Sequence, residues 1–152
     1  MVRTLSFCLV ALAAAPASAA PVSENRAVVA TVQEFFDALA AKNELRLLAT
    51  VVPGGIISAQ RIRDGKLVLR SEAWADWAKS IAASDEALEE RMHRPKVRVK
   101  GTIASVWTYY TFYHNGAFSH CGIDNFDLAK VNGRWKILNI SYTVETEGCQ
   151  KK

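Results

Sequence analysis

The chain has 152 residues, half of them hydrophobic, which is enough to build one domain with a single core. Its net charge of +4 comes from 19 basic and 15 acidic residues, and the basic ones are scattered along the sequence. This small excess does not indicate a nucleic-acid-binding protein. The densest basic stretch, residues 91–100, is interpreted as the solvated face of a strand.

The first 19 residues predict a secretory signal peptide, which leaves residues 20–152 as a single domain. Arg3 supplies a positive charge, Leu5–Ala15 is a short apolar run, and Ala17–Ala19 offers a cleavage site of small residues. No later stretch approaches the roughly 20 apolar residues that a membrane helix needs. We therefore expect an exported protein, periplasmic or secreted, without a membrane span.

Two cysteines, Cys121 and Cys149, remain once the leader with Cys8 is removed. Because exported proteins meet an oxidising environment, this pair predicts a disulfide rather than a metal site. Such a bridge would hold the C-terminal tail across the sheet. No nucleotide-binding loop, nucleophile elbow or zinc motif occurs, and the histidines fall on separate predicted elements, so neither a cofactor nor a metal is expected.

The first half of the chain predicts two helices followed by a hairpin. Apolar residues recur at helical spacing over 24–42, and residues 44–50 predict a short second helix. Residues 56–63 and 66–70 then predict two strands around Asp64–Gly65, a dipeptide typical of a two-residue hairpin turn.

A third helix is expected to begin after Ser71, which is a suitable N-cap. In this helix Trp74 and Trp77 share one face, which also carries the next apolar residues at helical spacing. A short strand is predicted over residues 88–92, before a break at Arg94–Pro95.

The region from Lys96 to Thr146 predicts the centre of the fold. It contains three runs of alternating apolar residues, joined by Asn115–Gly116 and Asn132–Gly133. Both faces of the resulting sheet carry apolar residues, so helices are expected to cover one face and a second subunit the other. The order of elements predicts an α+β fold: a cone-shaped, curved antiparallel sheet covered on one face by three helices.

The register that two-residue turns impose gathers polar and aromatic side chains on one face of this sheet. Asp124 is expected to face Trp107 on one neighbouring strand and Ser141 on the other, and His120 is expected to face Thr111. Tyr109 and Asn139 are predicted to lie on the same face as this group.

His120 and Asp124 are the candidate catalytic residues, because they lie four positions apart on one strand and share a face. A histidine and a carboxylate in an aromatic cavity can act as general acid and base when burial shifts their pKa values. Four strand residues span about 13 Å, so the two would address opposite ends of one ligand. The alternative is structural: a histidine at the rim, and an aspartate hydrogen-bonded to Ser141 or to the Trp107 indole.

The candidate ligand-binding residues are Trp74, Trp77, Trp107, Tyr109 and Asn139. The two helix tryptophans either belong to the core or stack on a planar ligand. Asn139 stands out in an apolar strand, because a buried amide needs hydrogen-bond partners. It is interpreted either as part of a wet or ligand-filled cavity or as a satisfied structural amide.

The order of these elements resembles the nuclear-transport-factor-2-like (SnoaL-like) superfamily over roughly residues 24–149. The residues that carry the resemblance are Val32–Leu39, Ser119–Asp124 and Asn132–Ile137. Within the superfamily, the chain is similar to small exported bacterial members described as "putative lumazine-binding". The resemblance implies a conical pocket between sheet and helices, and often a homodimer through the outer face of the sheet. It implies no single chemistry.

Three functions are open on this sequence. The first is an exported protein that binds a small planar or apolar molecule between helices and sheet. The second is a cofactor-independent isomerase, cyclase or dehydratase in which Asp124 or His120 is the acid or base. The third is a structural or accessory module whose interior is filled, and it predicts no cavity of roughly 300 Å³ or more.

Overall fold

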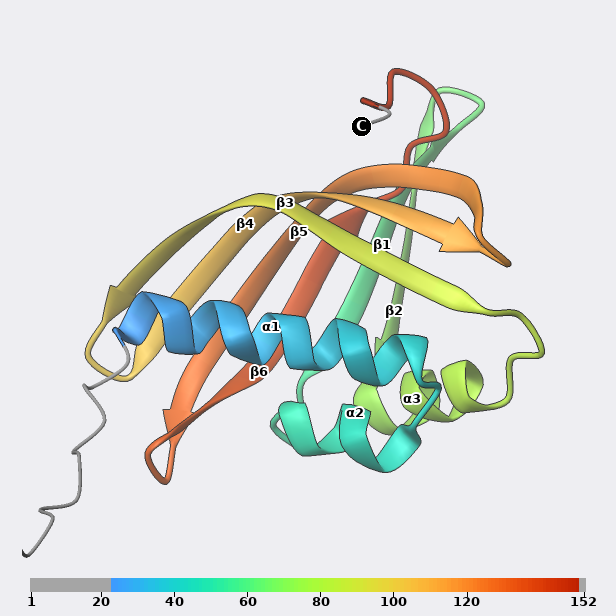
Figure 1. Cartoon of the computed structure of the whole chain (residues 1–152). Coiled ribbons are helices and arrows are strands. Elements are labelled where there is room, and N and C mark those ends of the chain that lie inside the picture. The colour runs from blue at the N-terminus through green and yellow to red at the C-terminus, as the bar shows by residue number, and fades with distance from the viewer. Residues whose placement is uncertain (1–22, 151–152) are drawn as a thin grey trace, which may run out of the picture.

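The computed structural model describes residues 23–150, in which three helices cover one face of a six-stranded sheet (Figure 1). The predicted signal peptide and the domain boundary at residue 20 lie outside the described residues. The elements in chain order are α1 (Glu24–Ala40), α2 (Glu44–Thr50), β1 (Ile56–Arg63), β2 (Lys66–Ala73), α3 (Trp74–Ala82), β3 (Leu88–Lys100), β4 (Ile103–His114), β5 (Ala117–Val131) and β6 (Arg134–Thr143).

Helix α1 lies under the arch of the sheet and supplies much of the core (Figure 1). Ser23 caps it, since its Oγ accepts a hydrogen bond from Arg26 N at 3.4 Å. The apolar residues at helical spacing are all buried and face the strands: Val28, Val32, Phe35, Phe36 and Leu39. The third helix begins later than expected, because β2 runs on to Ala73, and α3 starts at Trp74 without a side-chain cap.

The strands lie in the order β2-β1-β6-β5-β4-β3, and the sheet curves so that its concave face holds all three helices. This confirms the predicted α+β class with a curved sheet covered on one face. One pairing, β1 with β6, is parallel, whereas the others are antiparallel. These two strands are far apart in the sequence, so no hairpin turn dictates their relative direction.

The three predicted two-residue turns are confirmed. Asp64, Asn115 and Asn132 have φ values of 52°, 50° and 49°, and the glycine after each also has a positive φ. Two consecutive left-handed residues form the turn that matches the twist of a hairpin, and asparagine, aspartate and glycine are the residues that tolerate it.

The predicted break at Arg94–Pro95 is instead an irregularity inside one long strand. β3 continues from Leu88 to Lys100, with a register shift between His93 and Lys96, and Arg94 adopts a φ of 53°. The first five residues of the predicted central region, 96–100, therefore belong to β3, and the next turn lies at residues 101–102.

The predicted register between β4 and β5 is wrong by one residue beyond the turn. His114 pairs with Ala117 as expected, but Phe112 pairs with His120 and Tyr113 with Phe118, which leaves Ser119 as the extra residue of a bulge. Asp124 consequently faces Thr108, and the expected pairings with Trp107 and of His120 with Thr111 do not form.

A second bulge has the same effect between β5 and β6. Asp127 pairs with Asn139 and Leu128 with Ile137, so Leu138 is the extra residue. Asp124 therefore lies opposite Tyr142 instead of Ser141. Side chains alternate between the two faces of a sheet along each strand. Each one-residue shift in register therefore changes which residues of the neighbouring strand lie on the same face as Asp124.

Candidate functional site

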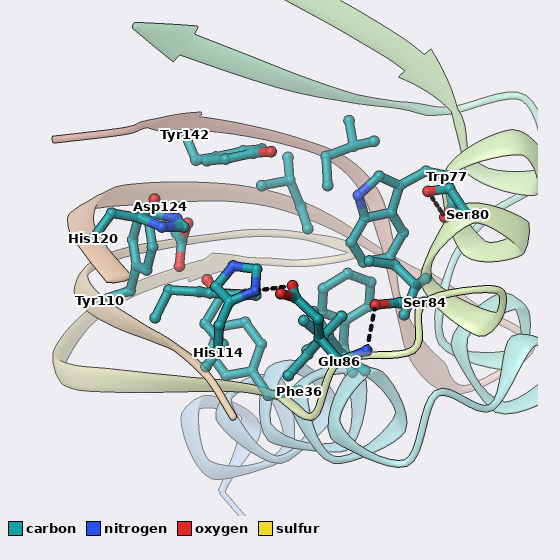
Figure 2. Close-up of a pocket in the computed structure, with 18 of the residues that line it drawn as sticks. Phe36, Trp77, Ser80, Ser84, Glu86, Tyr110, His114, His120, Asp124 and Tyr142 are labelled. Atoms are coloured by element: carbon teal, nitrogen blue, oxygen red, sulfur yellow. Dashed lines mark hydrogen bonds and ion pairs between the residues drawn. The ribbon is translucent and has the colours of Figure 1, made fainter. Parts of the chain in front are cut away.

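A cavity of about 310 Å³ lies between the concave face of the sheet and helices α1 and α3 (Figure 2). Tyr110, His120 and Asp124 enter it from the sheet, and Trp77 and Ser80 from α3 on the other side. The remaining lining residues are mostly apolar: Phe35, Phe36, Leu39, Ile57, Ile81, Leu88, Phe112, Phe126, Ile140 and Tyr142, with Ser84, Glu86, Glu90 and His114. The volume is at the lower end of the roughly 300–1,000 Å³ typical of small-molecule sites.

The helical wall is aromatic. The Trp77 indole stacks on Phe35, with ring centroids 5.3 Å apart and planes 10° from parallel, and it lines the cavity. Trp74 lies behind it in the core, where its Nε1 donates a hydrogen bond to Leu138 O at 3.0 Å. Of the two α3 tryptophans singled out from the sequence, Trp77 lines the cavity and Trp74 supports the wall.

Two carboxyl groups, those of Glu90 on β3 and Asp124 on β5, lie close enough to interact at the polar end of the cavity. Asp124 is 2% exposed, and Glu90 is half-buried. Burial raises the pKa of Glu90 to about 8. Burial, followed by the negative charge of Glu90, raises the pKa of Asp124 well above its usual range.

Burial disfavours the charged form of both carboxyl groups, and the adjacent carboxylate of Glu90 further raises the pKa of Asp124. The pair therefore holds at least one proton at neutral pH. Asp124 Oδ2 has no hydrogen-bond donor among the described residues, so it is satisfied only by a shared proton or by a group from outside the chain. A protonated pair can donate to one ligand atom and accept from another.

His120 borders the same end of the cavity and is neutral at pH 7. Burial lowers its pKa to about 4, with smaller contributions from the positive charges of His114 and Arg61. Its ring stacks on Phe112 at a centroid distance of 4.9 Å, and its Nδ1 lies 3.0 Å from Ser119 Oγ. A neutral imidazole held in this way can accept or donate one hydrogen bond without carrying charge.

Tyr110 forms the wall between His120 and the carboxyl pair, and its hydroxyl is already used. It donates to Thr143 O at 2.7 Å, and burial raises its pKa above the normal range. Gly122 allows Thr143 to approach this closely, because a Cβ at Gly122 would lie 2.0 Å from Thr143 O. Tyr110 is therefore a fixed surface of the site and not a free acid.

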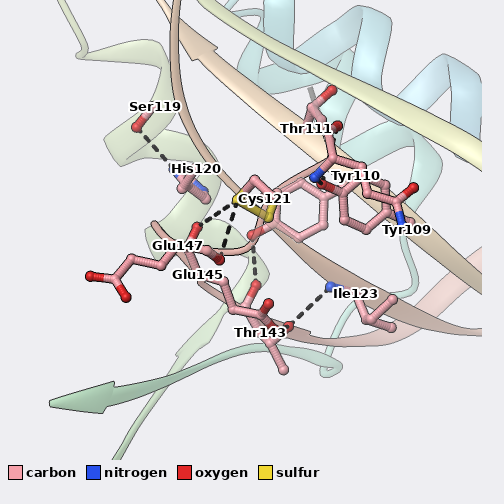
Figure 3. The surroundings of a disulfide bond; sticks show 12 residues. Tyr109, Tyr110, Thr111, Ser119, His120, Cys121, Ile123, Thr143, Glu145 and Glu147 are labelled. Atoms are coloured by element: carbon pink, nitrogen blue, oxygen red, sulfur yellow. Dashed lines mark hydrogen bonds between the residues drawn. A yellow bond between two sulfur atoms is a disulfide. The ribbon is translucent and has the colours of Figure 1, made fainter. Parts of the chain in front are cut away.

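The predicted disulfide between Cys121 and Cys149 is present (Figure 3). The tail after β6 is also tied to β5 by backbone hydrogen bonds of 2.9 and 2.8 Å between Cys121 and Glu145. These bonds hold Thr143, whose Oγ1 accepts from Ile123 N at 3.0 Å, against the strand that carries His120. The bridge thus fixes the outer side of the wall that forms the polar end of the cavity.

The other predicted ligand-binding residues do not reach the cavity. Trp107, 53% exposed, and Tyr109 lie on the outer face of the sheet, where the Tyr109 hydroxyl contacts the tail residue Gln150. The Asn139 side chain accepts a hydrogen bond from Ile56 N at 3.0 Å, which makes it a structural link between β6 and the start of β1. The two bulges are the reason, since they turn these residues away from His120 and Asp124.

Glu90 is a candidate site residue that sequence reasoning missed. It lies between Leu88 and Met92 on a strand, and both of these neighbours contact the core. Strict alternation therefore places the carboxylate on the buried face, which is the signal that could have identified it.

His114 and Glu86 also line the cavity, and their side chains are hydrogen-bonded to each other through His114 Nδ1 (Figure 2). Asn115 reinforces it, since its backbone N donates to Ala87 O at 2.8 Å and its Oδ1 accepts from Ala87 N at 2.9 Å. The β4–β5 turn is thereby linked to the loop between α3 and β3.

Within residues 23–150, no group of three or more histidine, cysteine, aspartate or glutamate side chains is arranged to hold a metal ion. In the same part of the chain, no helix is both long enough and apolar enough to cross a membrane.

Comparison with known structures shows the fold. A protein of unknown function with a cystatin-like fold from Nostoc punctiforme is 12% identical, with a TM-score of 0.64, over 80% of this chain and 91% of its own. A "putative dehydratase" of the nuclear-transport-factor-2-like family from Streptomyces avermitilis is 15% identical, with a TM-score of 0.63. The match covers 80% of this chain and 95% of that protein. A nuclear-transport-factor-2-like protein from Cytophaga hutchinsonii is 10% identical, with a TM-score of 0.67. The match covers 81% of this chain and 99% of that protein.

Among curated proteins, no match to the chain is found. A family model described as "Putative lumazine-binding" matches residues 23–143, which span all of the helices and strands described above. The chain therefore belongs to this family, and its fold is similar to that of nuclear-transport-factor-2-like proteins.

Proposed function

We propose that this protein binds a small planar molecule in the cavity between α1, α3 and the sheet. The observation that carries the proposal is the carboxyl pair Glu90–Asp124 at the polar end of a cavity that is otherwise lined mostly by aromatic and aliphatic residues. Buried polar groups are kept only where they are paired or functional, and Asp124 Oδ2 has no donor within the described residues. An incoming hydrogen-bond donor on the ligand would satisfy it.

The family description supports a heteroaromatic ligand, because lumazine is a flat bicyclic molecule with ring N–H and carbonyl groups along one edge. A flat body fits against the Trp77 indole and the Phe36 and Phe126 rings. The polar edge would then meet the carboxyl pair, which at neutral pH offers both a donor and an acceptor.

The test is a titration with lumazine and with the neutral, apolar fluorophore phenylnaphthylamine. Ser80→Trp would insert an indole into the cavity from an exposed position on α3, whereas Lys79→Trp makes the same change one residue away, outside the lining. We expect at least one probe to bind the wild type and the Lys79→Trp variant, and Ser80→Trp to weaken binding about tenfold or more. If neither probe binds the wild type, the proposal fails.

The second candidate function is acid–base catalysis of the isomerase or dehydratase kind. The specific observation in its favour is the raised pKa of Glu90, about 8, which suits a group that gives and takes a proton near neutral pH. Asp124 and the neutral His120 would complete the set of proton-handling groups around the cavity.

The two functions predict different behaviour of Asp124→Asn. Native mass spectrometry of protein purified from its own host would identify the resident molecule, and this compound would then be incubated with the wild type and with Asp124→Asn. Conversion by the wild type alone, with affinity retained in the variant, supports an enzyme. Absence of conversion with a change in affinity supports a binding protein.

Export to a periplasmic or extracellular space is part of the proposal. The disulfide supports it, because such bridges persist in oxidising compartments. A homodimer through the outer face of the sheet is also proposed, and the exposed apolar side chains Ile103 and Trp107 on that face support it. Light scattering of the purified protein tests the dimer, and a monomeric mass at micromolar concentration would contradict it.

A further inference from the structure

A second hollow, of about 560 Å³, opens next to the cavity and borders the inner face of β1 and β2. The two hollows share five lining residues: Ile57, Trp77, Ser80, His120 and Tyr142. A molecule that fills the cavity can therefore extend past this common rim into the second hollow, which we call the vestibule.

The vestibule carries an excess of positive charge. Three arginines line it, Arg61 and Arg63 from β1 and Arg70 from β2, against a single acidic residue, Glu72. Arg70 is already paired with Glu72, with Nε 2.8 Å from the carboxylate. Within the described part of the chain, neither Arg61 nor Arg63 makes a hydrogen bond or an ion pair, although both also border a neighbouring hollow lined by Glu145 and Glu147. Their guanidinium groups are therefore available to an anion in the vestibule.

Strand alternation explains how the charge reaches this place. Ile57, Ala59, Arg61 and Arg63 follow one another at every second position of β1 and all line the vestibule, and Ile57 also lines the cavity. The lining therefore changes along β1 from aliphatic beside the cavity to cationic at the far end. The charge of Arg61 acts on both His120 and Tyr142, which places it near the shared rim.

We propose that the vestibule binds an anionic group, such as a carboxylate, phosphate or sulfonate, carried by the ligand whose planar body occupies the cavity. This inference rests on the proposed binding function and assigns the ligand class as a planar aromatic anion. A guanidinium fork matches the geometry of these oxyanions, and two of them on one strand favour a single negative group over a neutral one.

The test compares two probes that share a body and differ in charge. Phenylnaphthylamine is neutral, and anilinonaphthalene sulfonate has the same two aromatic units with a sulfonate added. At pH 7 and low salt, we expect the wild type to bind the sulfonate about fivefold or more tightly than the neutral probe. Added salt should remove most of this preference, because exposed charges are screened.

The matched variants are Arg61→Gln/Arg63→Gln and Arg98→Gln/Lys100→Gln. The second pair removes the same charge from exposed positions on β3, at the opposite edge of the sheet. We expect the first variant to lose the preference for the sulfonate while its affinity for the neutral probe changes less than about twofold. The second variant should behave like the wild type.

The outcomes separate the two proposals. If the neutral probe binds but the sulfonate has no advantage, or if both double variants lose the advantage equally, the vestibule is not an anion site and the cavity still binds a ligand. If the wild type binds neither of these two probes, the vestibule proposal fails, and the proposed binding function fails with it when lumazine does not bind either.

Discussion

The protonated carboxyl pair should make the protein less stable as the pH rises from 6.5 to 8. The pKa of Glu90 is raised by burial from 4.5 to about 8, so in this range the folded protein holds a proton that the unfolded chain has already lost. Stability falls with pH wherever the folded state binds more protons, at about 1.4 kcal/mol per pH unit for one proton.

His120 has the opposite effect at lower pH. Its pKa is lowered to about 4 from 6.5, so between these values the unfolded chain binds the extra proton and stability rises with pH. The two slopes oppose each other below pH 6.5, and only the carboxyl contribution remains above it. Between pH 6.5 and 8 the expected loss is about 2 kcal/mol, which is the slope multiplied by the interval.

Urea unfolding at a series of pH values measures this loss. The variant Glu90→Gln/Asp124→Asn removes both titrating groups and keeps their shape, so its free energy of unfolding should be nearly constant from pH 6.5 to 8. The control Glu89→Gln/Asp127→Asn makes the same changes at solvent-accessible positions of the same two strands, and it should lose stability as the wild type does. Equal losses in the wild type and the Glu90→Gln/Asp124→Asn variant would refute the shared proton.

Three further outcomes are expected. Cys149→Ser opens the disulfide to Cys121 and should lower the free energy of unfolding by about 3 kcal/mol, visible as a lower urea midpoint. Gly122→Ala places a Cβ 2.0 Å from Thr143 O, and a Tm within a degree of the wild type would contradict that contact. Trp77→Ala removes the indole that lines the cavity, so phenylnaphthylamine should bind several-fold more weakly, and an unchanged affinity would argue against this wall.

Features that depend only on residues close together in the sequence could be predicted from it. The helical stripe of α1, the turns at Asn115–Gly116 and Asn132–Gly133 and the disulfide all follow from local patterns or from counting cysteines. Those patterns, together with the order of the elements, were sufficient to predict the α+β class. They also placed Asp124 and His120 on one face, because four positions along one strand keep the face regardless of what the neighbouring strands do.

The composition of the site was decided only by the tertiary structure. The bulges at Ser119 and Leu138 belong to a sheet that bends around helix α1, and no local pattern in the sequence marks where a bending sheet inserts its extra residue. Because side chains alternate with a period of two, those insertions removed Trp107 from the face that carries Asp124 and brought Tyr142 onto it. The carboxyl pair itself joins strands β3 and β5, which are not neighbours in the sheet, so no local sequence pattern links Glu90 to Asp124.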